Sequence, residues 1–299
     1  KLLSFENFTP ASICFYLKEI SSNKSTGPDG ISVQMLKKTL PYIVDILTDM
    51  FNRILSEGCF PSDWKLARIT PIFKQGDKSN PSNYRPISIL PILSKVFEKH
   101  VNVCLTNFLT KNKAIHNLQA GFRTGHSCTN SVHKILSDVT DKKQKQITVA
   151  MFLDFCKAFD CVDHQILYQK LKNFKIEGSS LQLLKSFLVD RRQFVGFSNQ
   201  VSKVLPITVG VPQGSILAPT LFLMFINDLL TLSLSSSAHA YADDTTFTCS
   251  HSDSHQLERL FSVDLEKIHE WCVLNRMTLI SRSHTSLCSG NQKIRSVLK

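Results

Sequence analysis

The chain has 299 residues, of which 42% are hydrophobic, and it carries a formal net charge of +11. This length suits one large domain or two subdomains, and this hydrophobic content excludes general disorder. The excess of basic residues favours a polyanionic partner, with nucleic acid ahead of a membrane surface, although a merely basic soluble protein has the same balance.

Nine cysteines are present, an odd number with irregular spacing and no Cys-x-x-Cys pair. This pattern is typical of reduced intracellular thiols and argues against a disulfide framework. One group of metal-ligating residue types does occur, but its spacing fits no common zinc module. The group consists of Cys249, His251, His255 and Cys272.

The longest apolar stretch, Ile216 to Leu234, is interrupted by Pro219, Asn227 and Asp228. These interruptions predict a buried helix and not a membrane span. The sequence shows no signal peptide. Because the chain begins with Lys1 and not with methionine, we expect it to be a piece of a longer protein.

In the first half of the chain, a turn-rich loop over Ser25–Gly30 precedes a helix. We expect this helix to begin at Pro41 and to end at Gly58, because apolar residues between Ile43 and Leu55 recur at helical spacing. The remaining predictions here are a strand over Leu66–Phe73, a basic loop over Lys74–Pro86 and a mostly helical stretch over Ile87–Leu109.

In the second half, the apolar run Ile147–Leu153 predicts a buried strand that ends at Asp154. The later elements are helices over Val162–Phe174 and Ser180–Val189, strands over Gln193–Phe197 and Val204–Val209, a helix after Ser215, a hairpin over Ala238–Cys249 and a helix through Leu257–Trp271. This mixture predicts an α+β fold in which helices cover one side of an antiparallel sheet.

Tyr241-Ala242-Asp243-Asp244 lies at the tip of the predicted hairpin. Adjacent carboxylates repel each other, so a cation between them is one reason to place them together, whereas a solvated acidic turn is the other interpretation. With Asp154, three carboxylates on two strand ends can hold two Mg²⁺ ions, an arrangement that serves phosphoryl transfer.

The residues that follow Asp154 suit a nucleotide site. Backbone N–H groups there can hold a triphosphate, and Phe159 can stack under a sugar and exclude a 2′-hydroxyl, although ordinary core packing is the alternative. Gln213, in the turn Gly210–Ser215, can offer its amide to a base or phosphate, although such a turn is often a plain helix cap.

Basic residues elsewhere supply candidates for contacts with phosphate. Lys74 and Arg85 are candidates for the β- and γ-phosphates of a nucleotide, with a solvated surface loop as the alternative. Arg191 and Arg192 can touch a nucleic-acid backbone, although an exposed helix end is an equally good interpretation.

Seven segments in a fixed order carry a resemblance that covers residues 25 to 275, most of the chain. They are Ser25–Gly30, Pro71–Lys74, Asn83–Ser88, Gln119–Arg123, Phe152–Asp160, Gly210–Pro219 and Tyr241–Phe247. Together they resemble the reverse transcriptase domain of a non-long-terminal-repeat (LINE-type) retrotransposon of the jockey-like and chicken-repeat-like group.

The resemblance implies a right-hand polymerase fold with fingers and palm, in which an antiparallel palm sheet packs on helices and the thumb is absent or truncated. The implied domains are fingers over 1–95, a first part of the palm over 96–165, a fingers insertion over 166–212 and the rest of the palm over 213–299.

The resemblance also implies the site residues. The implied catalytic and metal-binding residues are Asp154, Asp243 and Asp244, and the backbone carbonyl of Phe155 is a further metal ligand. The implied metal is two Mg²⁺ ions, with Mn²⁺ as an alternative. The implied nucleotide-binding residues are Lys74, Arg85, Phe155, Cys156, Ala158, Phe159 and Gln213. The implied primer and template contacts are Arg123, Pro212, Gly214, Tyr241 and Ala242.

The chain departs from the family pattern after Trp271, where a Lys-Thr pair is usual. In the family, that lysine is a candidate proton donor to pyrophosphate. Here Ser283 or His284 stands in its place. His284 can substitute for it, with a pKa nearer neutrality.

The implied function is RNA-directed DNA polymerisation in target-primed reverse transcription. The implied partners are an RNA template, a DNA primer or target and deoxynucleoside triphosphates, and no membrane is expected as a partner. The implied location is a retrotransposon ribonucleoprotein in the cytoplasm and the nucleus. Two alternatives are an inactive or truncated relic and a domesticated scaffold, each binding nucleic acid without polymerising. A third, an RNA-dependent RNA polymerase, is disfavoured by the bulk of Phe159.

Overall fold

The computed structural model describes residues 2–123, 125, 127, 129, 132–133, 135–137 and 146–280. These residues form two compact units that alternate along the chain: those within 2–114 and 164–221 form the first, and those within 115–163 and 222–280 form the second. The assignment of the chain to fingers and palm, with boundaries at 95, 165 and 212, stays a prediction.

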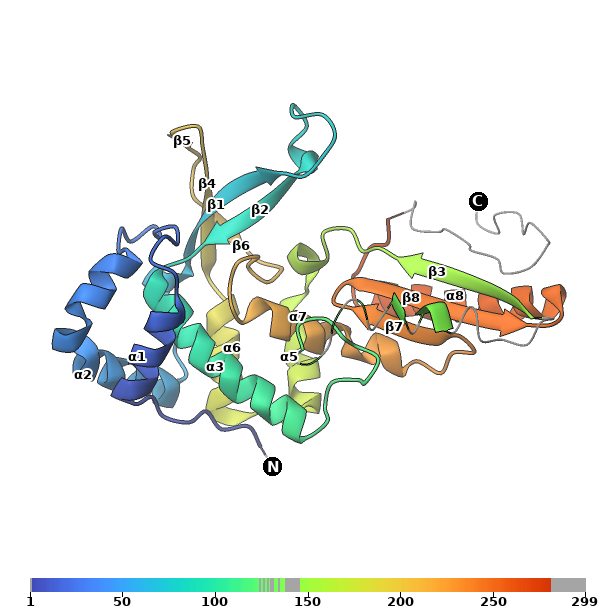
Figure 1. Ribbon diagram of the computed structural model, residues 1–299, viewed down its shortest axis with the longest axis horizontal. Coiled ribbons are helices and arrows are strands. Elements are labelled where there is room, and N and C mark those ends of the chain that lie inside the picture. Colours follow the sequence, from blue (N-terminus) through green and yellow to red (C-terminus); the bar gives the residue numbers. More distant parts are fainter. Residues whose placement is uncertain are drawn as a thin grey trace. The chain divides into compact units, whose positions relative to one another are not determined.

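The first unit contains a sheet in the order β2-β1-β4-β5, with β6 on β4. Strand β1 pairs antiparallel with β2 and parallel with β4. A single antiparallel sheet was therefore the wrong expectation, because β1 and β4 are joined through a long stretch of chain and run in the same direction (Figure 1). The strands are β1 (Leu66–Phe73), β2 (Tyr84–Ile89), β4 (Arg191–Phe197), β5 (Gln200–Val201) and β6 (Leu205–Ile207).

Helices of the first unit enclose an aromatic core. Phe51 and Phe97 are both fully buried and lie edge to face with ring centroids 5.6 Å apart, and Phe60 meets Phe187 at 5.1 Å. Such pairs add to the stabilisation that burial of apolar area provides. The helices are α1 (Pro10–Glu19), α2 (Val33–Glu57), α3 (Ile92–Lys111), α5 (His164–Asn173) and α6 (Gly178–Leu188).

Helix α2 begins eight residues before the predicted start at Pro41. The Ser32 side chain caps the helix by accepting from the amide of Met35, and Pro41 lies inside it. The prediction was wrong because proline is favoured in a first turn, whereas here the stronger signal was the serine cap.

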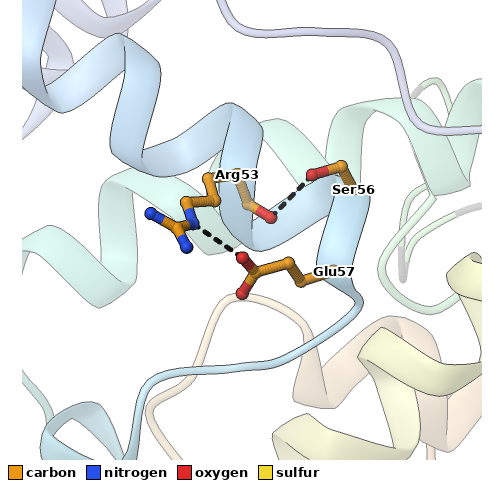
Figure 2. A network of polar contacts seen from close by, with 3 residues as sticks. All are labelled: Arg53, Ser56 and Glu57. Atoms are coloured by element: carbon orange, nitrogen blue, oxygen red, sulfur yellow. Dashed lines mark hydrogen bonds and ion pairs between the residues drawn. The ribbon is translucent and has the colours of Figure 1, made fainter.

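The end of α2 agrees with the prediction. Gly58 adopts φ 63° and donates its amide to the carbonyl of Ile54. Figure 2 shows the last turn, where Arg53 Nε lies 2.6 Å from Glu57 Oε1 and the Ser56 hydroxyl donates to the Arg53 carbonyl. Both charged side chains are more than half exposed, so this ion pair contributes little to stability.

The second unit contains the antiparallel sheet β3-β8-β7. Helix α8 (Ser254–Leu274) packs against β8 (Figure 1). The predicted antiparallel pairing holds for this sheet. Its strands are β3 (Ile147–Leu153), β7 (Ser237–Tyr241) and β8 (Asp244–His251).

Polar side chains on α8 fix the helix to the chain that precedes β7. Asp264 is buried on α8 and accepts from the amides of Ser235 and Ser236 at 3.0 and 2.8 Å. Trp271 donates its indole N–H to Asp228 at 3.0 Å. These contacts hold one end of the hairpin β7–β8 on the helix.

Helix α7 (Ala218–Ile226) begins in the first unit and ends in the second, and η4 (Asn227–Thr231) follows it. All of its residues except Pro219 are buried, as expected for the apolar stretch after Ser215. Across the described ranges, no helix combines the length and the apolar character that crossing a bilayer requires.

Candidate active site

Asp154 lies directly after β3, at the end of a strand whose residues are mostly buried. Its side chain is exposed, whereas Leu153 before it and Phe155 after it are buried. The main chain here is fixed by a neighbouring segment, because the Asp154 carbonyl accepts from the amide of Ile280 at 2.9 Å. The strand end therefore presents a carboxylate from a firmly held backbone.

Asp243 and Asp244 lie at the turn between β7 and β8, where Tyr241 pairs with Asp244 across the hairpin. Ala242 adopts φ 58°, in the left-handed region. A left-handed conformation costs an L-residue about 1–2 kcal/mol, and glycine usually takes this position. The turn is thus held in a conformation that alanine alone does not favour.

Strand register brings the aspartates to one edge of the sheet. Leu153, the last residue of β3, is paired with Thr245 on β8, so Asp154 and Asp244 are the next residues beyond this last pair. Asp243 follows in the adjoining turn, and all three carboxylates therefore belong to the same sheet edge.

Carboxylate oxygens are the ligands that Mg²⁺ prefers, so the chemistry of this donor set fits a hard divalent cation. Within the part of the chain that the structure describes, no three His, Cys, Asp or Glu side chains are gathered into a group that could hold a metal ion. The register aligns the aspartates along the edge without closing them into such a group.

The Ala242 peptide is held on both sides by the side chain of Gln119, which is fully buried. Its carbonyl oxygen accepts from the amides of Ala242 and Gly121 at 2.8 and 2.9 Å, and its N–H donates to the Ala242 carbonyl at 3.2 Å. Each such bond contributes about 0.5–1.5 kcal/mol net. Gln119 therefore supports the left-handed residue that precedes Asp243.

The segment around Gln119 also extends the sheet. Ala240 on β7 donates its amide to the Leu118 carbonyl at 3.0 Å, and the Ala240 carbonyl accepts from the amide of Ala120 at 2.8 Å. A Cβ added to Gly121 would lie 2.2 Å from the Ala242 nitrogen, so only glycine fits this approach. The sequence motif Gln119–Arg123 signalled this segment, but its role as the support of the turn was missed.

Phe159 lies in η3 (Ala158–Cys161), five residues after Asp154. Its ring stacks on the buried ring of Phe222, with centroids 4.5 Å apart and planes inclined by 18°, and Phe122 meets it edge-on at 6.3 Å. Phe159 itself is half-buried. The ring is therefore packed against two other aromatic rings while part of it stays accessible, and its role against a 2′-hydroxyl stays a prediction.

The residues whose backbone amides are predicted to bind a triphosphate differ in burial and in hydrogen bonding. The amide of Cys156 already donates to the Thr278 carbonyl at 2.8 Å. Phe155 and Ala158 are buried, whereas the Cys156 side chain is exposed. Nucleotide binding by these residues stays a prediction, with the Cys156 amide already engaged by the protein.

Among the residues of the second unit that are predicted to contact primer or template, Arg123 forms hydrogen bonds within the protein. Its Nη1 donates to the carbonyls of His116 and Gln119 at 3.0 and 2.9 Å, which braces the loop that supports the turn. Tyr241 is half-buried and Ala242 is buried. Their contact with a primer stays a prediction, and His284 lies outside the described residues.

In the first unit, Lys74 and Arg85 belong to the hairpin β1–β2 and are both exposed. Arg85 is paired with Ile72, and the amide of Lys74 donates to the Asn83 carbonyl at 2.9 Å. The hairpin therefore carries both residues at the end where the chain passes from β1 to β2. Arg191, in contrast, is only 2% exposed, so the idea that it touches a nucleic-acid backbone is wrong.

Gln213 and Gly214 rest on β2 in the first unit. The Ser88 amide donates to the Gln213 carbonyl at 2.7 Å. Gly214 adopts φ 120°, and a Cβ there would lie 2.4 Å from the Ser88 carbonyl oxygen. Pro212, which precedes them, is buried. The close contact of Gly214 with the Ser88 backbone fixes the turn and requires glycine at this position.

A family model described as reverse transcriptase (RNA-dependent DNA polymerase) matches residues 73–288, and the chain belongs to this family. The resemblance drawn from the motifs is thereby confirmed. The match spans the residues of both units named above, from Lys74 to the Asp243-Asp244 turn.

Three relatives from Drosophila melanogaster share about a third of their aligned residues with the chain. It is 34% identical over 247 residues to a probable RNA-directed DNA polymerase from transposon X-element, covering 81% of the chain and 27% of the relative. It is 32% identical over 265 residues to a probable RNA-directed DNA polymerase from transposon BS, covering 86% of the chain and 29% of the relative. It is 32% identical over 238 residues to the RNA-directed DNA polymerase from mobile element jockey, covering 77% and 26%. The chain thus spans little more than a quarter of the length of these relatives.

Proposed function

We propose that the chain carries out RNA-directed DNA synthesis, adding deoxynucleotides to the 3′-hydroxyl of a primer. The observation that supports this proposal is the strand pairing of Leu153 with Thr245 and of Tyr241 with Asp244, since Asp154 follows the first pair and Asp243 lies in the turn closed by the second. Reverse transcriptases generally use divalent metal ions. We assign two Mg²⁺ ions, or Mn²⁺, to these three aspartates with the Phe155 carbonyl as a further ligand.

In the proposed reaction, the primer oxygen forms a bond to the α-phosphorus, the bond to pyrophosphate breaks, and the hydroxyl proton is released. The bound ions would activate the hydroxyl and neutralise the leaving group. The aspartates hold the reacting atoms in place, and Tyr241 and Ala242 lie under the primer end. No covalent enzyme intermediate is needed, because alignment and charge neutralisation supply the catalysis.

The first unit supplies the groups proposed to bind the nucleotide. Lys74 and Arg85 contact the β- and γ-phosphates, since a planar guanidinium and a mobile ammonium both bind phosphate well. Gln213 contacts the incoming nucleotide from the turn that β2 supports. Pro212 and Gly214 in that turn, with Arg123 in the second unit, are proposed to contact primer or template.

The wider setting of the reaction rests on the relatives, whose names place them in transposons and a mobile element. We propose an RNA template, a DNA primer at a nicked target and deoxynucleoside triphosphates as partners, in a retrotransposon ribonucleoprotein of cytoplasm and nucleus. His284 is the proposed proton donor to pyrophosphate.

One observation favours a second candidate, a chain that binds nucleic acid without polymerising. In the described residues the aspartates are aligned but no three-ligand group is gathered. The deciding experiment is primer extension by the purified chain on RNA and on DNA templates, with deoxy or ribo triphosphates and with or without Mg²⁺. We expect Mg²⁺-dependent extension with deoxynucleotides on RNA; binding to primer–template without extension would support the second candidate instead.

Replacing Phe159 with alanine should raise the incorporation of ribonucleotides relative to deoxynucleotides. The ring is held in place by Phe222, so a 2′-hydroxyl against it would meet a side chain that cannot easily retreat. Relief of a steric conflict of about 1–3 kcal/mol corresponds to roughly 10–100-fold in the ratio of kcat/KM values. The measurement is single-nucleotide extension with each triphosphate. Phe15→Ala, which removes an exposed ring on α1, is the control, and an unchanged ratio in Phe159→Ala would show that Phe159 does not exclude the 2′-hydroxyl.

A further inference from the structure

Glu98 on α3 is a buried carboxylate that the sequence motifs did not single out. One of its oxygens accepts from the Ser94 hydroxyl at 2.7 Å. The other accepts from the Ser215 hydroxyl at 2.5 Å and from the Ile216 amide at 2.8 Å. A buried charge is tolerated only when it is hydrogen-bonded in this way, so the carboxylate and its partners form one fixed group.

Ser215 links Glu98 to the start of α7. Its hydroxyl oxygen accepts from the amides of Leu217 and Ala218 at 3.1 and 3.2 Å while the hydroxyl donates to Glu98. A serine that accepts from the first amides of a helix is a typical cap, and a negative charge nearby is favourable there. Glu98 thus fixes the helix start from a different helix, 117 residues earlier in the chain.

A second buried charge, on Arg191, is attracted by Glu98. The Arg191 guanidinium donates from Nη1 to the Phe187 carbonyl at 2.9 Å and lies 4.8 Å from the Phe187 ring centroid. Burial lowers the pKa of Arg191 to about 10, against the opposing attraction of Glu98, so the group stays charged at neutral pH. The carboxylate is therefore held by hydrogen-bond donors of the loop and attracted by a buried cation.

The proposed nucleotide-contacting turn lies between this anchor and β2. Ser88 holds the Gln213 carbonyl from one side, and Ser215, two residues on, is held by Glu98 from the other. Gly214 between them has no room for a side chain. The position of the Gln213 side chain consequently depends on both anchors.

We propose that Glu98 is a positioning residue of the polymerase, which fixes the turn Gln213-Gly214 through Ser215 so that Gln213 meets the incoming nucleotide. This inference rests on the proposed role of Gln213. It predicts that loss of the carboxylate weakens nucleotide binding while the chemistry of bound nucleotide changes little.

The test compares Glu98→Ala with Ser94→Ala and Glu98→Gln. Ser94→Ala is the matched control, because it removes a buried hydrogen bond to the same carboxylate but leaves the links to Ser215 and Ile216. Glu98→Gln keeps an acceptor for those links and can donate to Ser94, so it should restore most of the function that alanine loses.

Hydrogen exchange followed by mass spectrometry gives a readout that does not depend on polymerase activity. In Glu98→Ala, amides 215–218 should exchange at least about tenfold faster than in Ser94→Ala, while those of β1 and β2 keep their protection. Equal protection in the two variants would overturn the anchoring role.

Extension kinetics test the link to the nucleotide. The KM for deoxynucleotide should rise about tenfold in Glu98→Ala and little in Ser94→Ala, with kcat within about twofold. An equal KM in both would overturn the proposal. A wild-type chain that extends no primer would instead refute the proposed function, and hydrogen exchange would still decide the anchoring. Ser215→Ala breaks the same link while leaving the carboxylate in place, and serves both measurements if Glu98→Ala does not fold.

Discussion

Asp154→Asn should abolish primer extension, with kcat/KM reduced at least about a thousandfold. Asparagine keeps the size of the side chain but removes the negative charge, and charge stabilisation by a bound metal contributes several kcal/mol to such reactions. Because Asp154 is exposed and lies, like Asp244, directly beyond the last pair of β3 with β8, the substitution also reduces negative charge at this end of the sheet. The melting temperature should therefore stay the same or rise slightly.

The measurement is steady-state extension of a primer on an RNA template, accompanied by thermal unfolding of the same preparations. Glu258→Gln, which neutralises an exposed carboxylate on α8, should leave both activity and melting temperature unchanged. If Asp154→Asn kept more than about a tenth of the activity, Asp154 would not be a metal ligand.

Gly121→Ala should reduce activity by about a hundredfold, since a misplacement of about 1 Å at a reacting centre has an effect of this size. The added Cβ would lie 2.2 Å from the nitrogen and 2.8 Å from the Cα of Ala242, and these backbone atoms can move away only by shifting the turn that carries Asp243. Overpacking of this kind also destabilises a protein by roughly 1–3 kcal/mol.

Gly196→Ala is the matched control for this substitution. Its added Cβ would meet only side-chain atoms of Arg68 at 3.3 and 3.5 Å, and a flexible side chain can give way. Chemical denaturation gives the free energy of unfolding of both variants, and extension assays are run well below their melting temperatures. Full activity in Gly121→Ala would show that the segment Gln119–Arg123 does not govern the position of the turn.

Two strands could be predicted from the sequence with their bounds. Both β1 and β3 begin and end at the predicted residues, because each is bounded by polar or turn-forming neighbours. The stretch over Ile87–Leu109 was less tractable: β2 extends to Ile89 and α3 begins only at Ile92. Short apolar runs do not distinguish a strand from a helix, and here pairing with β1 decides the outcome.

The parts of the site that could not be predicted depend on contacts between distant residues. The motif marked the aspartates, but the Gln119 side chain reaches Ala242 across 123 positions, and Glu98 reaches Ser215 across 117. Nothing in the local pattern around a single glutamine or glutamate identifies such a partner. The parallel pairing of β1 with β4 was missed for the same reason.

The central claim is that carboxylates from the end of β3 and from the β7–β8 turn bind the same divalent ions. Its most direct test is to count Mn²⁺ ions by electron paramagnetic resonance on the chain with an RNA template, a dideoxy-terminated primer and the matching deoxynucleotide. We predict two bound ions in the wild-type chain, displaced by Mg²⁺, and the loss of at least one in Asp154→Asn and in Asp243→Asn. Unchanged Mn²⁺ binding in both variants would contradict the claim.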